Sequence, residues 1–253
     1  MKNKTVLVTG AASGIGAAVI HHAIREQADR VIALDLDQQG LKRLCDQPLG
    51  QTELVTLALD LTDHQLVADK LLPQVEQFGG IDTVVISHGV ADENQITDDD
   101  IWDKVMSVNL HATQRLLSLL EGHMVDKGSI VVVSSILGLV GKLSNTAYCS
   151  SKHGLLGLVK GLALDLARRK IRVNAVLPSW VDTPMLRREV QKQADLTGIS
   201  EKDMFRRIKK RIPLRSLVSA EDVADCVLFF ASDQARMITA QSLVMDGGDG
   251  CGL

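Results

Sequence analysis

The stretch Thr5-Val6-Leu7-Val8-Thr9-Gly10-Ala11-Ala12-Ser13-Gly14-Ile15-Gly16 decides the fold of this 253-residue chain. An apolar run of strand length opens it, and a helical pattern begins at Ile15. Between them, Gly10, Gly14 and Gly16 let the backbone approach a ligand with no Cβ in the way. Such a turn between strand and helix is typical of a site where backbone N–H groups hold a pyrophosphate. The alternative is an ordinary tight turn, which three glycines in seven residues disfavour.

The rest of the chain repeats this alternation of short apolar runs and longer helical patterns. Most of the runs are apolar on both faces, which is typical of a parallel sheet covered by helices. We therefore predict a single α/β domain over residues 1–253: a Rossmann-type, doubly wound parallel sheet of seven strands with helices on both faces. The predicted strands are 6–9, 31–34, 54–58, 83–86, 130–133, 172–176 and 242–245, and the predicted helices are 15–26, 64–77, 99–124, 147–169 and 220–231.

Composition bounds the class of function. Apolar residues make up 45% and aromatic residues 3%, so Leu, Val, Ile and Ala must build the core. A formal net charge of −3 gives no general attraction to nucleic acid or anionic membranes. The N-terminal apolar run is too short for a signal peptide, and no run is long enough to span a membrane. We expect a cytoplasmic protein without a metal, with free thiols at cysteines 45, 149, 226 and 251.

An acidic residue follows the glycine turn at the sequence separation expected for a ribose-binding carboxylate. Asp35 ends the second strand, nineteen residues after Gly16. A carboxylate about 20 residues after such a turn typically binds the ribose hydroxyls of a dinucleotide. It would also repel a 2′-phosphate, and neither Leu36 nor Asp37 is basic. The sequence therefore favours NAD over NADP, the alternative being that Asp35 merely turns into a loop.

The tyrosine of the chain, Tyr148, is followed four residues later by Lys152. On a helix, residues four apart share a face, with Cβ atoms about 5–6 Å apart. A nearby cation favours the phenolate and lowers the phenol pKa from its ordinary value of about 10. The two residues are therefore a candidate proton-transfer pair, although this spacing also arises by chance.

Ser135 ends the fifth strand, and Asn109 is a polar residue among apolar neighbours that needs a partner.

In this order, the motifs resemble the short-chain dehydrogenase/reductase family, in its compact branch of about 250 residues. The resemblance covers nearly the whole chain. It implies a catalytic tetrad of Asn109, Ser135, Tyr148 and Lys152. It also implies that NAD is bound by Gly10, Ser13, Gly14, Ile15, Gly16, Asp35, Asp60, Leu61, Gly89, Tyr148, Lys152, Val181 and Thr183.

The resemblance further implies a mechanism, in which a secondary alcohol and a ketone are interconverted by hydride transfer. Tyr148, as phenolate, would accept the alcohol proton, and Ser135 would hydrogen-bond the substrate oxygen. Lys152 would lower the tyrosine pKa and bind the nicotinamide ribose, and Asn109 would hold a helix kink and a water. A regulator that senses NAD is the non-enzymatic alternative, but it should have lost part of the tetrad. An epimerase needs a longer chain, and an enoyl reductase a wider Tyr–Lys spacing.

Two segments depart from the family pattern. Ile86-Ser87-His88-Gly89 stands where the family has Asn-Asn-Ala-Gly, and we interpret His88 as structural or adjacent to the cofactor rather than catalytic. Pro178-Ser179 replaces Pro-Gly, so the backbone at Ser179 should avoid a positive φ.

The segment 184–212 resembles the family's substrate lid and is called the lid segment here. It holds nine Lys or Arg against four Asp or Glu, a net charge of +5. It either steers an anionic substrate, such as a carboxylate or a coenzyme A thioester, or forms a solvated helical face. The alternative function is thus a 3-hydroxy acid (3-hydroxybutyrate-like) or acyl-thioester dehydrogenase, although Leu137 and Asn145 replace expected carboxylate-binding groups. We expect an apolar substrate pocket that includes Leu137, Trp180, Met185 and Leu186.

The helical pattern from 147 onward carries Gly154, Gly157 and Gly161 among leucines. An all-round apolar helix needs burial on more than one side. Together with the family resemblance, which implies a dimer or tetramer, this pattern leads us to expect a homotetramer.

Overall fold

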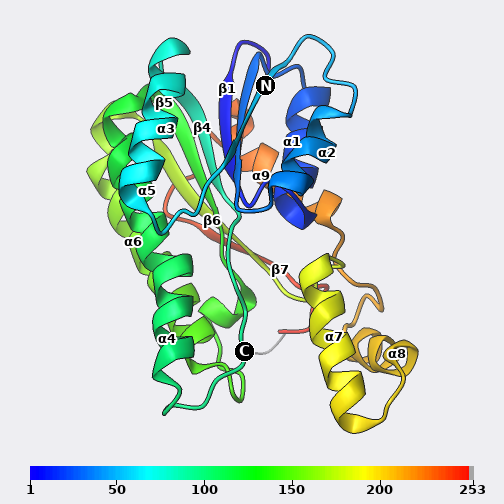
Figure 1. Cartoon of the computed structure of the whole chain (residues 1–253). Coiled ribbons are helices and arrows are strands. Elements are labelled where there is room, and N and C mark those ends of the chain that lie inside the picture. The colour runs from blue at the N-terminus through cyan, green and yellow to red at the C-terminus, as the bar shows by residue number, and fades with distance from the viewer. Residues whose placement is uncertain (251–253) are drawn as a thin grey trace.

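A computed structural model describes residues 1–250 of the chain (Figure 1). Cys251, one of the four expected thiols, lies outside the described residues, and cysteines 45, 149 and 226 are free. Seven parallel strands form one sheet in the order β3-β2-β1-β4-β5-β6-β7. The strands are β1 (Thr5–Thr9), β2 (Arg30–Asp35), β3 (Glu53–Ala58), β4 (Ile81–Ile86), β5 (Met124–Val133), β6 (Arg172–Pro178) and β7 (Ser242–Met245). The predicted doubly wound fold is confirmed, and its strand order reverses between β1 and β4.

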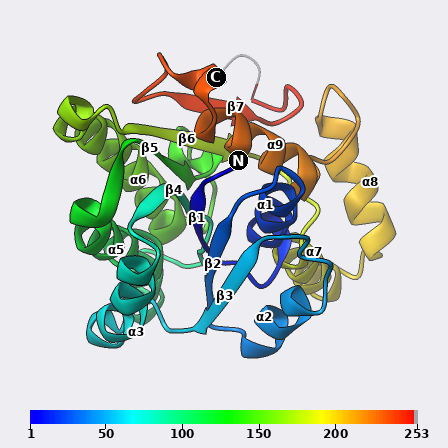
Figure 2. The same cartoon turned by 90° about the horizontal axis from the view of Figure 1, so that it is seen from above.

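Helices cover both faces of the sheet, as Figure 2 shows. One face is covered by α1 (Gly14–Arg25), α2 (Gln38–Cys45) and α9 (Ala220–Ala231), and the other by α3 (His64–Gln77), α5 (Ala112–Leu120) and α6 (Thr146–Asp165). Successive side chains of a strand point to opposite faces. Accordingly Val6 and Val8 of β1 join one core cluster and Leu7 joins the other. This two-sided burial explains why the strands read as apolar on both faces.

The predicted helix 99–124 is wrong as a single element. The chain forms α4 (Asp99–Met106), a π-helical turn at Ser107–His111, then α5, and β5 already begins at Met124. An apolar pattern does not show where a helix changes its hydrogen-bond register, so only the kink expected at Asn109 indicated the break. Helix α2 was not predicted because it is short and buries only Gly40, Leu41 and Leu44.

The lid segment folds as two helices, α7 (Pro184–Thr197) and α8 (Glu201–Arg211). Thr183 caps the start of α7, and Gly198, with a φ of +68°, ends it. At the base of the segment, the backbone N–H of Asp182 donates to Val218 (2.9 Å) and that of Val218 to Trp180 (3.0 Å). The chain therefore leaves and rejoins the domain at one place, and α7 and α8 lie together away from the sheet (Figure 1).

Two smaller observations complete the fold. Ser179 does not adopt a positive φ, as predicted from its replacement of glycine. Within residues 1–250, no helix combines the length and the apolar character that crossing a membrane requires.

Candidate active site

The glycine turn lies at the carboxyl end of β1, next to the point where the strand order reverses. A Cβ on Gly10 would lie 2.8 Å from backbone atoms of His88, and one on Gly16 would lie 2.1 Å from the Gly10 carbonyl oxygen. A Cβ on Gly14 would lie 3.2 Å from Cγ2 of Thr183, so the turn meets the residue that opens the lid segment. The three glycines thus form a tight backbone cradle between β4 and α7, the kind of turn that holds a dinucleotide pyrophosphate.

Asp35 lies at the tip of β2 beside this turn. Its carboxylate accepts hydrogen bonds from the backbone N–H groups of Ala12 (2.9 Å) and Asp37 (2.8 Å). The residue predicted to select NAD therefore also fixes the glycine turn. Asp60, at the end of β3, is exposed and accepts from the N–H (2.9 Å) and the hydroxyl (2.7 Å) of Thr62. Leu61 beside it is buried.

The predicted catalytic residues meet between β5 and α6. Lys152 is buried, and its Nζ donates to the Val133 carbonyl (3.2 Å) and lies 5.5 Å from the centroid of the Tyr148 ring. Ser135 is buried at the end of β5 and hydrogen-bonds the Tyr148 side chain. Its Oγ also accepts from the N–H of Leu137 (3.1 Å), which fixes the serine rotamer. The structure thus brings Ser135, Tyr148 and Lys152 into one group.

The pKa values within this group differ from the expected pattern. Burial raises the pKa of Tyr148 to about 12; the hydrogen bond from Ser135 opposes this rise, and the carboxylate of Glu189 adds to it. Burial also lowers the pKa of Lys152 to about 8. The expected lowering of the tyrosine pKa is therefore not produced by the polypeptide alone, because loss of hydration disfavours the phenolate more than the protein's own groups favour it.

Asn109 lies in the π-turn and joins three segments. Its side-chain amide exchanges two hydrogen bonds with the backbone of Val90, one to the carbonyl (3.0 Å) and one from the N–H (2.8 Å). It also donates to the Ser151 hydroxyl (3.1 Å) on α6. A Cβ on Gly89 would lie 3.2 Å from the Asn109 Oδ1 and 3.7 Å from the Lys152 Nζ. Gly89 therefore lets the segment after β4 reach both residues, and the expected helix kink is the π-turn.

His88 has a larger structural role than the sequence suggested. Its Nε2 lies 3.1 Å from the Val108 carbonyl, and its Nδ1 lies 2.8 Å from the Thr9 hydroxyl. A carbonyl only accepts, so Nε2 carries the proton and Nδ1 accepts from Thr9. Burial and the charge of Lys152 lower the pKa of His88 to about 4, so the ring is neutral near pH 7. The neutral ring ties β1 to the π-turn, in agreement with the interpretation that His88 is not catalytic.

An ion pair that sequence reasoning missed lies beside Trp180, one of the residues expected to line the apolar pocket. Lys142, seven residues after Ser135, lies 2.6 Å from Glu189 of α7 and 5.7 Å from the ring centroid of Trp180. The effect of Glu189 on the pKa of Tyr148 places this carboxylate within electrostatic reach of the site. Leu186 is buried, and Met185 is 38% exposed. Leu186 therefore packs α7 against the domain, and its role in a substrate pocket stays a prediction.

A second link ties α7 to the segment after β4. Lys192 lies 3.8 Å from the carboxylate of Glu93, and the Gln193 side chain donates to the same carboxylate (3.5 Å). Together with the Lys142–Glu189 pair, this contact fixes α7 to the two segments that follow β4 and β5. The lid segment is therefore joined to both sides of the site.

These features coincide with a known family. The chain matches, over residues 10–249, the sequence model described as enoyl-(acyl carrier protein) reductase. It is 34% identical to a 3-oxoacyl-(acyl-carrier-protein) reductase of Thermotoga maritima, with 98% of both chains covered. It is 36% identical to a human (3R)-3-hydroxyacyl-CoA dehydrogenase (98% of this chain, 96% of the other) and 31% identical to a D-beta-hydroxybutyrate dehydrogenase of Rhizobium meliloti (97% and 98%). The chain belongs to the short-chain dehydrogenase/reductase family.

Solved structures agree with this assignment. Carveol dehydrogenase from Mycobacterium avium in complex with NAD superposes with a TM-score of 0.90, at 29% identity and 98% coverage of both chains. A variant of actinorhodin polyketide ketoreductase with NADPH gives a TM-score of 0.87, at 30% identity, covering 99% of this chain and 100% of the other. The protein is therefore an oxidoreductase that uses a nicotinamide cofactor on secondary alcohols or ketones. The glycine cradle and the buried Lys152 fit such a cofactor, whereas the two neighbours differ in which form they bind.

Proposed function

We propose that this protein interconverts a secondary alcohol and a ketone with NAD(H), with Ser135, Tyr148 and Lys152 as catalytic residues and Asn109 as the fourth member of the tetrad. The observation that carries this proposal is the convergence of these four residues next to the glycine cradle. The bound nicotinamide would supply or accept the hydride. The dinucleotide would be held by the contact residues that the family resemblance implies, from Gly10 to Thr183, with the Val181 backbone and Thr183 at the nicotinamide end.

Different side chains would transfer the proton of the substrate hydroxyl and hold the substrate oxygen. In ketone reduction, the Tyr148 hydroxyl donates its proton to the carbonyl oxygen while Ser135 hydrogen-bonds the same oxygen. In the protein alone, the pKa of Tyr148 near 12 keeps the phenol protonated at neutral pH, which is the form that donates. For oxidation, the phenolate must form, and the charge of Lys152 favours it. Asn109 holds the segment that follows β4 against α6 and so fixes the position of Lys152.

The choice of NAD over NADP rests on Asp35. Its carboxylate lies beside the glycine turn, bonded to Ala12 and Asp37, where a 2′-phosphate would meet a negative charge. A panel of neutral secondary alcohols and ketones, assayed with each cofactor through the absorbance of the reduced nicotinamide, tests the proposal. Turnover should be faster with NAD(H). A preference for NADP(H) would refute the role of Asp35, and a lack of turnover with both would refute the reaction.

A second candidate is the oxidation of a 3-hydroxy acid or an acyl thioester. The Lys142 ammonium near Trp180 supports it, since it supplies a cation that Leu137 and Asn145 do not provide. The relatives named above act on substrates of these types according to their names. Glu189 already neutralises Lys142, however, so a substrate carboxylate would have to replace it. A higher kcat/KM for hydroxy acids than for neutral alcohols of equal size would establish this candidate. The matching family model is described as enoyl-(acyl carrier protein) reductase, but Tyr148 and Lys152 are four residues apart, which is closer than an enoyl reductase requires, so we do not propose enoyl reduction.

We also propose a cytoplasmic homotetramer, with a dimer as the alternative. On α6, a Cβ at Gly157 or Gly161 would meet no atom within 4 Å, and Leu164 is 77% exposed. This helix therefore presents a smooth, partly apolar face that a second copy would cover. Sedimentation at micromolar concentration should show a tetramer, and a monomer would refute the proposal. A regulator without catalysis remains the non-enzymatic alternative, and the turnover assay separates the two.

A further inference from the structure

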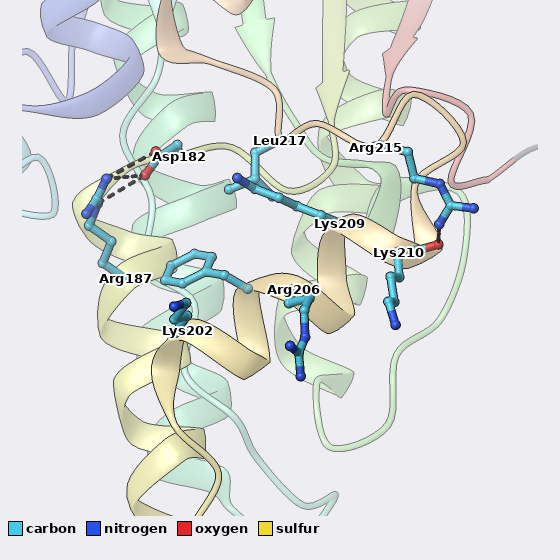
Figure 3. A pocket seen from close by; sticks show the side chains of 9 residues that line it. Asp182, Arg187, Lys202, Arg206, Lys209, Lys210, Arg215 and Leu217 are labelled. Atoms are coloured by element: carbon cyan, nitrogen blue, oxygen red, sulfur yellow. Dashed lines mark hydrogen bonds and ion pairs between the residues drawn. The ribbon is translucent and has the colours of Figure 1, made fainter.

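A cavity of about 550 Å³ lies in the lid segment, apart from the catalytic tetrad. Within the described residues, its lining comes from the start of α7, from α8 and from the loop that follows, and none of it from the glycine turn or the tetrad. The lining is formed by Asp182, Arg187, Lys202, Phe205, Arg206, Lys209, Lys210, Arg215 and Leu217 (Figure 3). Six of these nine residues are cations, and one is an anion.

Part of this charge is already compensated. Arg187 forms two hydrogen bonds to the Asp182 carboxylate, of 3.0 and 3.1 Å, at one end of the cavity (Figure 3). Arg206 lies 2.8 Å from Asp203. Four cations, Lys202, Lys209, Lys210 and Arg215, have no carboxylate within 4 Å among the described residues. The cavity therefore has a large excess of positive charge.

The stability of α8 does not explain this arrangement. Lys202, Arg206 and Lys210 follow one another at four-residue spacing, and like charges at this spacing destabilise a helix. Lys202 also lies in the first turn, where the helix dipole disfavours a cation. The helix dipole favours Lys209 and Lys210, because they lie in the last turn. Both nevertheless line the same cavity as Lys202, whose position the dipole disfavours. No side chain of α8 is fully buried, and the half-buried ones include Met204, Phe205 and Ile208, so packing does not dictate the basic residues on its exposed surface either.

We propose that this cavity binds a nucleoside phosphate with two or more negative charges. Four cations without a carboxylate partner line one concave space and suit phosphate groups, which accept several hydrogen bonds each. One of the four, Arg215, also donates to the Lys210 carbonyl (Figure 3). Phe205 and Leu217 add an apolar part to the lining, against which a flat base can pack. The volume lies within the range of about 300–1,000 Å³ that is usual for small-ligand pockets. This concavity favours a small ligand over the surface of an acidic protein or a membrane.

The bound nucleotide has two possible sources. It can be the nucleotide end of a coenzyme A thioester substrate, or it can be a free nucleotide. In both cases it would contact Arg187, whose partner Asp182 directly precedes Thr183, the residue next to Gly14. A nucleotide bound in the cavity would therefore alter the contacts at the start of α7. The site does not depend on the proposed reaction, because it shares no residue with the tetrad.

Calorimetric titration of the protein saturated with NADH tests the site. The probes are adenosine 3′,5′-bisphosphate, which is the nucleotide end of coenzyme A without its arm, and ADP. We expect saturable binding that weakens as salt increases. A variant carrying Lys209→Gln and Lys210→Gln should bind the probes at least about tenfold more weakly, since two charge-assisted contacts are lost. The control carries Lys42→Gln and Lys70→Gln, two exposed lysines outside the lid segment, and should bind as the wild type does.

The outcomes separate the possibilities. Competitive inhibition of thioester turnover by adenosine 3′,5′-bisphosphate identifies the site as the substrate's nucleotide end, and binding without competition identifies a free nucleotide. Absence of binding at millimolar probe, or equal affinity of the double lysine variant and the wild type, would overturn the proposal. Binding to anionic phospholipid vesicles without binding to either nucleotide would overturn it as well. Circular dichroism of each variant verifies that it is folded, and the binding result stands whether or not turnover is found.

Discussion

At Tyr148, the hydrogen bond from Ser135 favours the phenolate, whereas burial and Glu189 favour the phenol. The balance in the protein alone keeps the proton on the oxygen. Loss of the hydroxyl in Tyr148→Phe removes both the donor and the acceptor of the proton. Turnover should fall by about 10²–10⁴-fold, the usual size of a general acid–base contribution. Affinity for NADH should stay close to that of the wild type, and retained turnover would remove Tyr148 from the mechanism.

Because the chain has one tyrosine, its titration can be observed directly. The phenolate absorbance of the free protein should appear only well above pH 10, in agreement with a pKa raised to about 12 by burial. Addition of NAD brings a positive charge to the site and should lower this pKa. The Tyr148→Phe variant supplies the blank. An unchanged pKa in the NAD complex would contradict the proposed base in alcohol oxidation.

His88 makes stability depend on pH. Its pKa is about 4 in the folded protein and about 6.5 when unfolded, so the unfolded state binds the extra proton first. The free energy of unfolding should therefore decrease as pH falls from about 6.5 to 4, by up to about 3 kcal/mol from this group. Urea unfolding of the wild type and of His88→Gln at pH 7 and pH 5 measures it. The variant should lose less stability on acidification, and equal losses would exclude His88 as the source.

At the scale of elements, α7 brings the Glu189 carboxylate to the edge of the site. Glu189→Gln breaks the ion pair with Lys142 and removes a negative charge that raises the Tyr148 pKa. The acidic limb of the pH profile of kcat/KM for alcohol oxidation should therefore shift to lower pH. Asp195→Asn, an exposed charge change on the same helix, is the control and should leave the profile in place. A profile that does not move in Glu189→Gln would show that this carboxylate does not act on the tyrosine.

The same elements show what a sequence can reveal. The glycine turn and the Tyr148–Lys152 pair are local patterns, so their spacing alone predicted a strand, a helix and a shared face. The π-turn at Asn109 is local as well, but its side-chain hydrogen bonds reach Val90, nineteen residues away. The contact of His88 with Thr9 spans 79 residues, and that of Lys142 with Glu189 spans 47. Such long-range partners cannot be predicted from local spacing, because the arrangement of the strands in the sheet determines which segments lie close together.

For the whole molecule, cofactor binding and folding are linked. A ligand that binds only the folded state stabilises it by about 2.7 kcal/mol at 100 times its Kd. Because Asp35 would repel a 2′-phosphate, the melting temperature should rise more with NAD than with NADP at equal concentration. Asp35→Asn keeps one acceptor oxygen, which can serve the Ala12 N–H, but it loses the acceptor for the Asp37 N–H and the negative charge. The variant should therefore reduce the difference between the two melting-temperature rises. A larger rise with NADP in the wild type would contradict the predicted cofactor.

The paired backbone at the base of the lid segment, where Val218 bonds to Trp180 and Asp182, has an evolutionary consequence. The two helices between these points begin and end at one location; α7 buries Leu186, Val190 and Ala194, whereas no side chain of α8 is fully buried. Insertions, deletions or a replacement within α8 should therefore leave the register of all seven strands unchanged. Substrate range can therefore change through this segment while the catalytic residues and the glycine turn stay the same. A chimera that carries the corresponding excursion of a relative would be the direct way to transplant specificity.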